Sequence, residues 1–163
     1  MKLRILIVAA AVAAVLSSCK SQYEMLLNSN DADLKYEAAF NYYNEGKYSK
    51  AGSLFESLSV LTNGTQRDDT VRFYWGLSNY KFKDYYTAET NFANFLETYP
   101  RSPFASEARY LRLDCLYRST LRWELDQTPT YKAMTEISEY MIEFPKTPHM
   151  QTCRDMLQDL NDR

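Results

Sequence analysis

The chain has 163 residues, of which 45% are hydrophobic and 15% aromatic, and its formal net charge is −2. This length corresponds to one domain. Acidic residues outnumber basic ones and the lysines and arginines form no cluster, which argues against a nucleic-acid partner, because phosphate binding needs a concentrated positive face.

Residues 1–18 have the pattern of a lipoprotein signal peptide. Lys2 and Arg4 precede an unbroken run of 12 apolar residues, which is too short to span a bilayer comfortably and is typical of a secretory signal. The tetrapeptide Leu-Ser-Ser-Cys that ends at Cys19 resembles the bacterial lipobox, in which the cysteine carries the lipid. We therefore predict lipidation of Cys19 and a mature formal charge of −4, from 17 basic and 21 acidic residues. The alternative is an ordinary signal peptide or a short anchor with a chance cysteine.

Residues 19–30 are predicted to be a short tether, because they contain several serines and asparagines and show no clear period. An apolar run within them would also be able to dock on the structure that follows. We expect the folded domain to occupy residues 31–163. The apolar run comprises Tyr23, Met25, Leu26 and Leu27.

From residue 31 onward, apolar side chains recur every three or four positions, which predicts helices. The first helix spans residues 31–45, and a return helix spans residues 48–61. Gly46 and Lys47 form the turn between them. The side chains expected on the buried side of the first helix are Leu34, Ala38, Ala39, Tyr42 and Tyr43.

A second helical hairpin over residues 69–100 has the clearest pattern. Lys83 and Asp84 form its polar turn, and Pro100 ends it because proline cannot extend a helix. Gly76 leaves out a side chain at a point where we expect the second helix to come close.

The hairpin recurs along the chain. Counting back 37 positions from Ala88 gives Ala51, and counting forward 45 gives Ala133, with similar aromatic and aliphatic residues around each. A single hairpin of this size cannot bury its own apolar face, so each copy needs a neighbour. The sequence therefore predicts an all-α fold, an α-solenoid of about three and a half helical hairpins.

The third hairpin begins at Ser102-Pro103, which supplies a capping hydroxyl and a proline at the first helical position. We expect its first helix to run to about Trp123, longer than its counterparts, and its return helix to span residues 130–144. Thr147-Pro148 repeats the start signal for a final helix over residues 149–163. This helix either caps the solenoid with its polar side or precedes a further repeat.

Cys115 and Cys153 lie on predicted helices among apolar neighbours. We expect two buried thiols that behave as small hydrophobic residues. A disulfide between the third hairpin and the final helix is the alternative, since an exported protein meets an oxidising compartment.

The sequence offers no evident catalytic, metal-binding or cofactor-binding constellation. Its single histidine, His149, stands at a predicted helix start without the partners that a catalytic base or metal ligand needs. Its four glycines are scattered and form no phosphate-binding loop. We therefore expect a protein that is not an enzyme and that uses no metal or cofactor.

Aromatic residues are abundant on the leading helices of the hairpins, which line the concave surface when such hairpins stack. Their rings would suit an extended peptide with aromatic side chains, and the alternative is that they pack between hairpins. In the third copy, arginines would make this groove basic, so that a peptide carboxylate would pair there. The predicted groove residues are Tyr36, Phe40, Tyr43, Phe73, Leu77, Tyr80, Arg109 and Arg112.

The hairpins resemble the tetratricopeptide repeat. They share with it a small residue in the first helix, a tyrosine after the turn, an alanine in the second helix and a proline at the exit. Arg112 departs from this pattern at the small position. The matching residues are Ala39, Gly76, Tyr48, Tyr85, Ala51, Ala88, Ala133, Pro100 and Pro145.

Three further segments, together with the lipobox, make the chain resemble the BamD family of outer-membrane assembly lipoproteins. They are Tyr99-Pro100-Arg101-Ser102-Pro103, Leu125-Asp126-Gln127-Thr128 and Phe144-Pro145-Lys146-Thr147-Pro148. The resemblance implies a scaffold anchored through Cys19 on the periplasmic face of the outer membrane, and Lys20 fits export to that membrane.

The same resemblance implies three kinds of partner. They are a BamA-like insertase, other subunits of the β-barrel assembly machinery, and unfolded outer-membrane proteins, whose terminal strands often end in an aromatic residue. Family members have about five repeats, and the later repeats supply much of the insertase contact.

Two other functions share part of this pattern. A general periplasmic repeat scaffold in cell-envelope maintenance would have the lipobox and the hairpins without needing the segment 125–128. A glycan-binding lipoprotein would need long insertions to form a sugar site, and the sequence has none.

Overall fold

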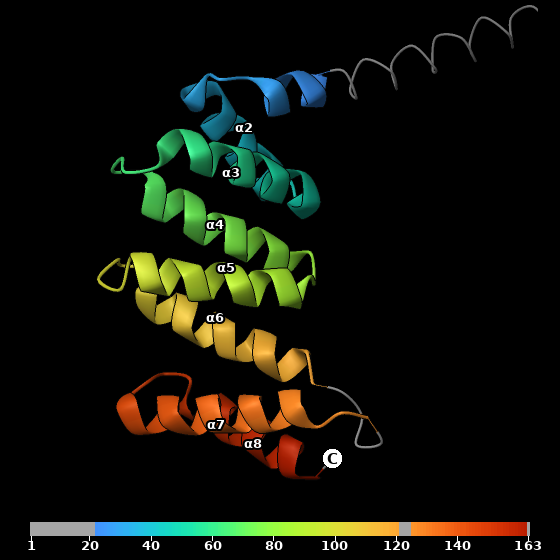
Figure 1. Cartoon of the computed structure of the whole chain (residues 1–163), viewed down its shortest axis with the longest axis vertical. Coiled ribbons are helices and arrows are strands. Elements are labelled where there is room, and N and C mark those ends of the chain that lie inside the picture. The colour runs from blue at the N-terminus through green and yellow to red at the C-terminus, as the bar shows by residue number, and fades with distance from the viewer. Residues whose placement is uncertain (1–21, 121–124, 163) are drawn as a thin grey trace, which may run out of the picture.

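The computed structural model describes residues 22–120 and 125–162. Within these ranges no residue belongs to a β-strand, and no helix is long and apolar enough to cross a membrane. The predicted signal peptide and Cys19 lie outside the described residues. A helix over residues 22–28 is followed by α2 (Ala32–Asn44), α3 (Tyr48–Thr62), α4 (Asp68–Lys81), α5 (Tyr85–Thr98), α6 (Ala105–Arg118), α7 (Thr128–Glu143) and α8 (Met150–Asp162) (Figure 1).

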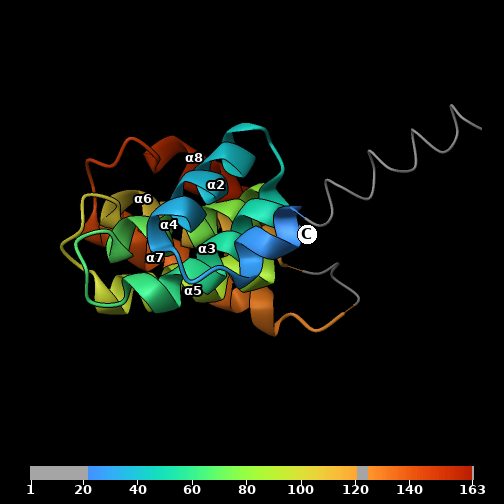
Figure 2. The same cartoon turned by 90° about the horizontal axis from the view of Figure 1, so that it is seen from above.

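The helices form two layers. Figures 1 and 2 show α2, α4, α6 and α8 on one side and α3, α5 and α7 on the other. From α2 to α8, each helix packs on the next one in sequence, and the chain runs from one end of the stack to the other (Figure 1). The turns within the first two hairpins lie along one edge, and the turns between hairpins lie along the opposite edge (Figure 1). This arrangement confirms the predicted all-α solenoid.

Neighbouring hairpins share their cores. The first cluster of buried side chains combines α2 and α3 with Val71 of α4. The second combines α4 and α5 with Ala108 and Leu111 of α6, and the third combines Leu113 and Leu116 of α6 with α7 and α8. Each hairpin therefore completes its interior with residues of the next, as a solenoid requires.

The small residues of the repeat lie where the helices come closest. Ala51, Ala88 and Ala133 have no exposed surface. At Gly76, an added Cβ would lie 2.9 Å from a ring carbon of Phe92 in α5, a distance that side-chain carbons do not adopt. The absence of a side chain at Gly76 therefore allows α4 and α5 to pack, as the sequence predicts.

Aspartates cap two helices and help to fix the turns. Asp31 Oδ1 accepts hydrogen bonds of 3.0 Å from the amides of Asp33 and Leu34 at the start of α2. Asp84 accepts one from a backbone amide in the first turn of α5. The preceding Lys83 has a φ of 68°, in the left-handed region, which closes the tight turn between α4 and α5.

The first helix of the third hairpin is shorter than predicted. It has 14 residues, the same length as α4 and α5, and it ends before the position of Trp123. The Ser119 hydroxyl donates to the Cys115 carbonyl at 2.8 Å. The Thr120 hydroxyl donates to the Tyr117 carbonyl, also at 2.8 Å. These side chains satisfy carbonyls at the end of α6, so the helix can stop although the apolar period continues.

The segment predicted to be a tether is helical over residues 22–28. Tyr23, Leu26 and Leu27 pack against the first cluster, in agreement with the docking alternative, whereas Met25 is exposed. The chain is therefore ordered on the first hairpin from a point close to its predicted lipid anchor.

Leu34 is exposed instead of buried, and the next residue, Lys35, takes the buried position. The Lys35 ammonium donates to the Leu27 carbonyl at 2.9 Å and to the Ser57 hydroxyl at 2.6 Å. Burial lowers the pKa of this ammonium. The two bonds tie the helix over residues 22–28 to the first hairpin, which apolar spacing alone does not reveal.

Cys115 and Cys153 are free and fully buried, and they belong to different clusters. This confirms the buried-thiol prediction over the disulfide. Burial raises the pKa of the Cys115 thiol to about 12 and also raises the pKa of Cys153. Both thiols therefore stay protonated and unreactive at neutral pH.

We predict that Gly76→Val lowers the free energy of unfolding by about 1–3 kcal/mol, because the new carbon atoms would enter space filled by the Phe92 ring. Urea denaturation followed by circular dichroism measures this change. Thr90→Val, at an exposed position of α5, is the control and should stay within about 0.5 kcal/mol of the parent. An unchanged urea midpoint for the Gly76 variant would contradict the close helix contact.

Candidate functional site

The first two predicted groove residues lie together on an accessible part of α2. Tyr36 and Phe40 are half-buried, and their ring centroids are 4.7 Å apart. With Glu37 and Asn41 they line an open hollow of about 410 Å³. The Arg67 guanidinium stacks over the Tyr36 ring at 5.1 Å, which holds that ring in place. The hollow therefore offers aromatic surface, an amide and a carboxylate to an extended chain.

A ladder of rings connects this hollow to the second hairpin. Phe40 lies 4.7 Å from Tyr74 of α4 and 5.0 Å from Phe55 of α3, and Tyr43 lies 5.2 Å from Tyr74. Burial, with a smaller electrostatic effect of Tyr74 and Tyr48, raises the pKa of Tyr43 to about 12. The Tyr43 hydroxyl therefore remains a hydrogen-bond donor. The rings pack between hairpins and keep part of their surface accessible, and the peptide groove stays a prediction.

Tyr74 is a residue that the groove prediction lacks. It lies three positions before Leu77 on α4, and it contacts rings of α2, α3 and the α5–α6 connection. Helical spacing places Tyr74 on the same side as Leu77, but the 37-residue interval between the first two hairpins aligns it with Glu37, which is not aromatic.

Phe73 is not part of an accessible groove. Its side chain is 4% exposed, and it stacks on the Phe104 ring at 4.6 Å between nearly parallel planes. It also contacts Phe92 and Phe95 of α5. The prediction of a groove position for Phe73 is therefore wrong, because this ring fills the junction between the second and third hairpins.

Leu77 and Tyr80 are half-buried on α4 and pack against the second cluster. The Tyr80 hydroxyl donates to Asp114 of α6 at 2.5 Å, and Arg118 donates to the same carboxylate at 2.5 Å. Burial and the bond to Asp114 raise the pKa of Tyr80. The Tyr80 hydroxyl thus serves the contact between hairpins, and a peptide would meet only the remaining face of its ring.

The two arginines of the predicted basic end are paired with glutamates. The Arg112 guanidinium donates to Glu136 of α7 at 2.9 and 3.0 Å and to Glu89 of α5 at 3.0 Å. Arg109 pairs with Glu143 of α7 at 3.0 Å. The structure therefore corrects the expectation of a basic end, because both guanidinium groups are already neutralised.

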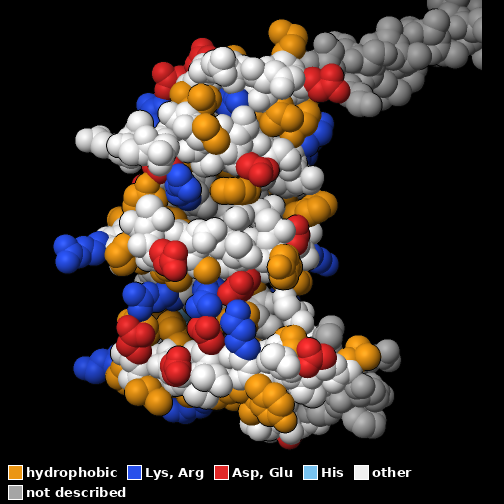
Figure 3. All heavy atoms as spheres, viewed as in Figure 1, with side chains coloured by type: hydrophobic (Ala, Val, Ile, Leu, Met, Phe, Trp, Pro, Cys, Tyr) orange, Lys and Arg blue, Asp and Glu red, His pale blue; other side chains and the backbone are white. Residues whose placement is uncertain are grey.

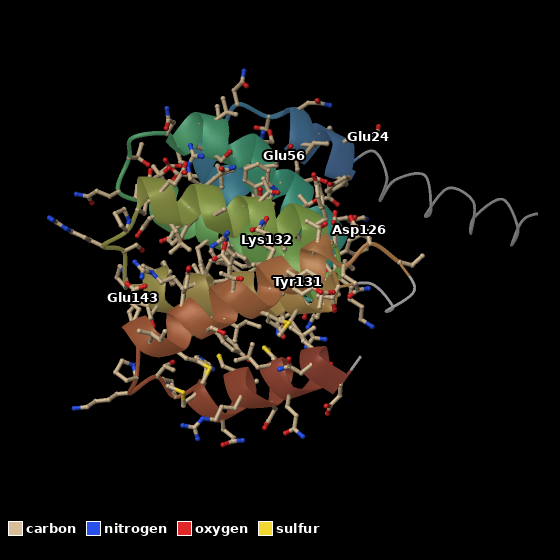
Figure 4. The ribbon with its side chains drawn as sticks, turned by 60° about the horizontal axis from the view of Figure 1, so that its bottom comes forward. Glu24, Glu56, Asp126, Tyr131, Lys132 and Glu143 are labelled. Atoms are coloured by element: carbon tan, nitrogen blue, oxygen red, sulfur yellow. The ribbon has the colours of Figure 1, made fainter. Side chains whose placement is uncertain are left out.

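The surroundings of these pairs are as acidic as they are basic. Lys132 lies 3.6 Å from Glu89, and it is labelled with Glu143 on α7 in Figure 4. A hollow of about 210 Å³ between α5, α6 and α7 also includes Glu139. Figure 3 shows the resulting band of mixed charge across the molecule above α7. A peptide carboxylate would therefore meet carboxylates as well as arginines there.

The single histidine, His149, packs against neighbouring side chains of α6. Its ring stacks on Tyr110 at 3.6 Å, and Nε2 lies 3.8 Å from Glu107. Among the described residues, no three side chains of histidine, cysteine, aspartate or glutamate are grouped to hold a metal ion.

Comparison with known proteins gives two findings. A family model described as "YfiO: Outer membrane lipoprotein" matches residues 28–163. A curated relative, "Outer membrane protein assembly factor BamD" of Caulobacter vibrioides (strain ATCC 19089 / CIP 103742 / CB 15), is 21% identical over 160 residues, which cover 96% of this chain and 52% of that protein. The chain thus spans about half the length of the curated relative that it matches.

We predict that Arg112→Met lowers the free energy of unfolding by about 1–3 kcal/mol, because it removes the cation that pairs with Glu136 and leaves Glu89 only its longer, 3.6 Å pair with Lys132. A double-mutant cycle with Glu136→Gln, measured by urea denaturation, should give a coupling energy of about 0.5–3 kcal/mol. Lys47→Met, which breaks an exposed pair with Glu45, is the control and should cost less than about 1 kcal/mol. Additive effects at Arg112 and Glu136 would refute the network.

Proposed function

This chain belongs to the YfiO family of outer membrane lipoproteins, and from this premise we propose that it is a lipid-anchored scaffold subunit of the machinery that assembles β-barrel proteins in the outer membrane. The family match over residues 28–163 carries the proposal, because it includes nearly every described helix. The assembly-factor name of the Caulobacter relative supports the same role.

The anchor in this proposal is the lipidated Cys19, and the repeat domain lies on the periplasmic face. The described chain begins three residues after that cysteine and is immediately docked on the first hairpin. A lipid chain there would hold the solenoid near the membrane.

The unfolded barrel protein would bind the layer formed by α2 and α4. The surface combines the hollow at Tyr36 and Phe40 with the half-buried faces of Tyr74 and Leu77. Aromatic side chains of a barrel strand would stack on these rings, and tyrosine hydroxyls would bind its backbone. The charged residues near Arg112 would leave that end of the layer less suited to an apolar strand.

The insertase and the remaining subunits would bind other surfaces of the scaffold. Because this chain spans about half of the curated relative, its contact with the insertase is a separate proposal from its contact with substrate. The general periplasmic scaffold described above is the competing outcome.

We predict that full-length protein, extracted with mild detergent from the outer membrane of the bacterium that makes it, co-purifies with a β-barrel insertase. Mass spectrometry of the eluate identifies the partners. Cys19→Ser is the control for the anchor and should reduce recovery, because the protein no longer concentrates at the membrane. Recovery of cell-wall enzymes without a barrel insertase would refute the assembly role in favour of a general envelope scaffold.

We also predict that Tyr36→Ala and Leu77→Ala each weaken binding of a barrel-derived C-terminal peptide by about tenfold, since each removes apolar contact surface. Fluorescence anisotropy of the labelled peptide measures the dissociation constant. Val60→Ala, at a side chain 77% exposed on α3, should leave binding unchanged. A peptide whose terminal aromatic residue is replaced by alanine should lose the sensitivity to Tyr36→Ala. Equal binding by all variants would place the substrate site elsewhere.

A further inference from the structure

A second, chemically different surface lies on the edge that contains the turns within the first two hairpins. A hollow of about 450 Å³ is open there between the start of α3 and the α4–α5 turn. Phe82, at its rim, has 56% of its surface exposed. The lining also includes Tyr48 and four lysines, Lys47, Lys50, Lys81 and Lys83.

The hollow is basic in a protein whose overall charge is negative. Glu45 pairs with Lys47 at 2.6 Å, so these two residues add no net charge, and Asp84 caps α5. Lys50, Lys81 and Lys83 supply the positive charge of the hollow. Lys81 and Lys83 are exposed on either side of Phe82. Exposed lysines around an exposed aromatic ring are the combination that binds an anionic lipid surface, where the ammonium groups meet phosphates and the ring enters the interface.

The beginning of the described chain adjoins this hollow. The Tyr23 hydroxyl donates to the Lys50 carbonyl at 3.3 Å, and the Lys50 ammonium lies 5.1 Å from the centre of the Tyr23 ring. Figures 1 and 2 show the start of the helix over residues 22–28 on the same edge as the α2–α3 turn. The chain therefore enters the fold beside the basic hollow.

The entry point is fixed relative to the first hairpin. The bonds from Lys35 to Leu27 and Ser57 hold the carboxyl end of the helix over residues 22–28. Gln22 follows Cys19 by three positions, so the Cα atom of Cys19 lies within roughly 10 Å of the Cα atom of Gln22. So short a link to a docked helix restricts which face of the solenoid can meet the bilayer.

We propose that the edge formed by Lys50, Lys81, Lys83 and Phe82 lies on the anionic phospholipid surface of the membrane that holds the lipid anchor. This inference rests on the anchor at Cys19 in the proposed function. It sets the orientation of the scaffold, with the helix axes pointing away from the bilayer and the two layers of helices accessible from the sides. The hollow at Tyr36 and Phe40 is then reachable by a chain that approaches along the membrane.

A fluorescence experiment on the full-length lipidated protein tests this orientation. Ser49→Cys, in the lining of the hollow, and Val60→Cys, about 16 Å further along α3, each carry an environment-sensitive NBD label. Cys115 and Cys153 are fully buried, so they do not compete for the label. The proteins are reconstituted into vesicles of phosphatidylcholine with or without phosphatidylglycerol.

We predict a severalfold increase and a blue shift of emission for the Ser49 label in vesicles that contain phosphatidylglycerol, and little change for the Val60 label. Lys81→Glu with Lys83→Glu should abolish the increase. Arg101→Glu with Lys146→Glu, which makes the same charge change on the opposite edge, should leave it intact.

Vesicle flotation distinguishes the hypothesis of a lipid anchor at Cys19 from the hypothesis about the orientation of the scaffold. If the protein floats with the vesicles but the Ser49 label keeps its aqueous emission, the orientation is refuted while the anchored scaffold stands. Equal responses at Ser49 and Val60, or no effect of the Lys81 and Lys83 changes, also overturn the orientation and would indicate another use for the basic hollow, such as an acidic protein partner. Failure to float refutes the anchor and the orientation together.

Discussion

The structure depends on aromatic and aliphatic side chains that no single hairpin can bury. Phe73 shows this constraint most directly, since its ring is enclosed by Phe92 and Phe95 of its own hairpin and by Phe104 from the connection to the next. Burying a phenylalanine side chain contributes about 1.5–3 kcal/mol, so each junction between hairpins is a large share of the stability of a small domain. The contacts between hairpins therefore stabilise the stack. The side chains on its surface are not needed for this packing, so their polarity can differ from one face to another.

The packing differs along the stack, and this difference divides the molecule. In the first two hairpins it is aromatic, with Tyr74 contacting rings from three elements and Gly76 allowing α4 and α5 to pack closely. In the third hairpin, Arg112 occupies the small position of the repeat and forms ion pairs with Glu89 of α5 and Glu136 of α7. Aromatic contacts between helices are consequently concentrated in the first two hairpins, and the third contributes paired charges that nearly cancel.

Much of the fold follows from the sequence because it depends on periodicity and on small residues. The spacing of Ala51, Ala88 and Ala133 predicted three buried positions, and all three have no exposed surface. The sequence does not show which of two adjacent residues is buried when a polar one can form hydrogen bonds in the interior. Lys35 displaces Leu34 from the interior through bonds to a carbonyl and a hydroxyl that lie far away in sequence. The end of α6 was missed because hydroxyl side chains terminate a helix whose apolar pattern continues.

The candidate groove shows the same limit. Spacing placed Phe73 and Tyr36 in equivalent positions, but the connection that carries Phe104 covers one and nothing in the described chain covers the other to the same extent. The charge of the arginines was visible in the sequence, whereas the glutamates that neutralise them come from two other helices. Residue type at a position can thus be predicted from a repeat, but accessibility depends on the loops and neighbours that the repeat does not determine.

The proposed lipid-anchored scaffold is consistent with the family membership, the shared cores of neighbouring hairpins and the docked start of the described chain. The most direct test is depletion of the protein in the bacterium that makes it, followed by quantification of folded, heat-modifiable β-barrel proteins in the outer membrane. The account predicts that folded barrel proteins fall while other outer-membrane lipoproteins keep their abundance. Unchanged levels of folded barrel proteins after depletion would contradict it.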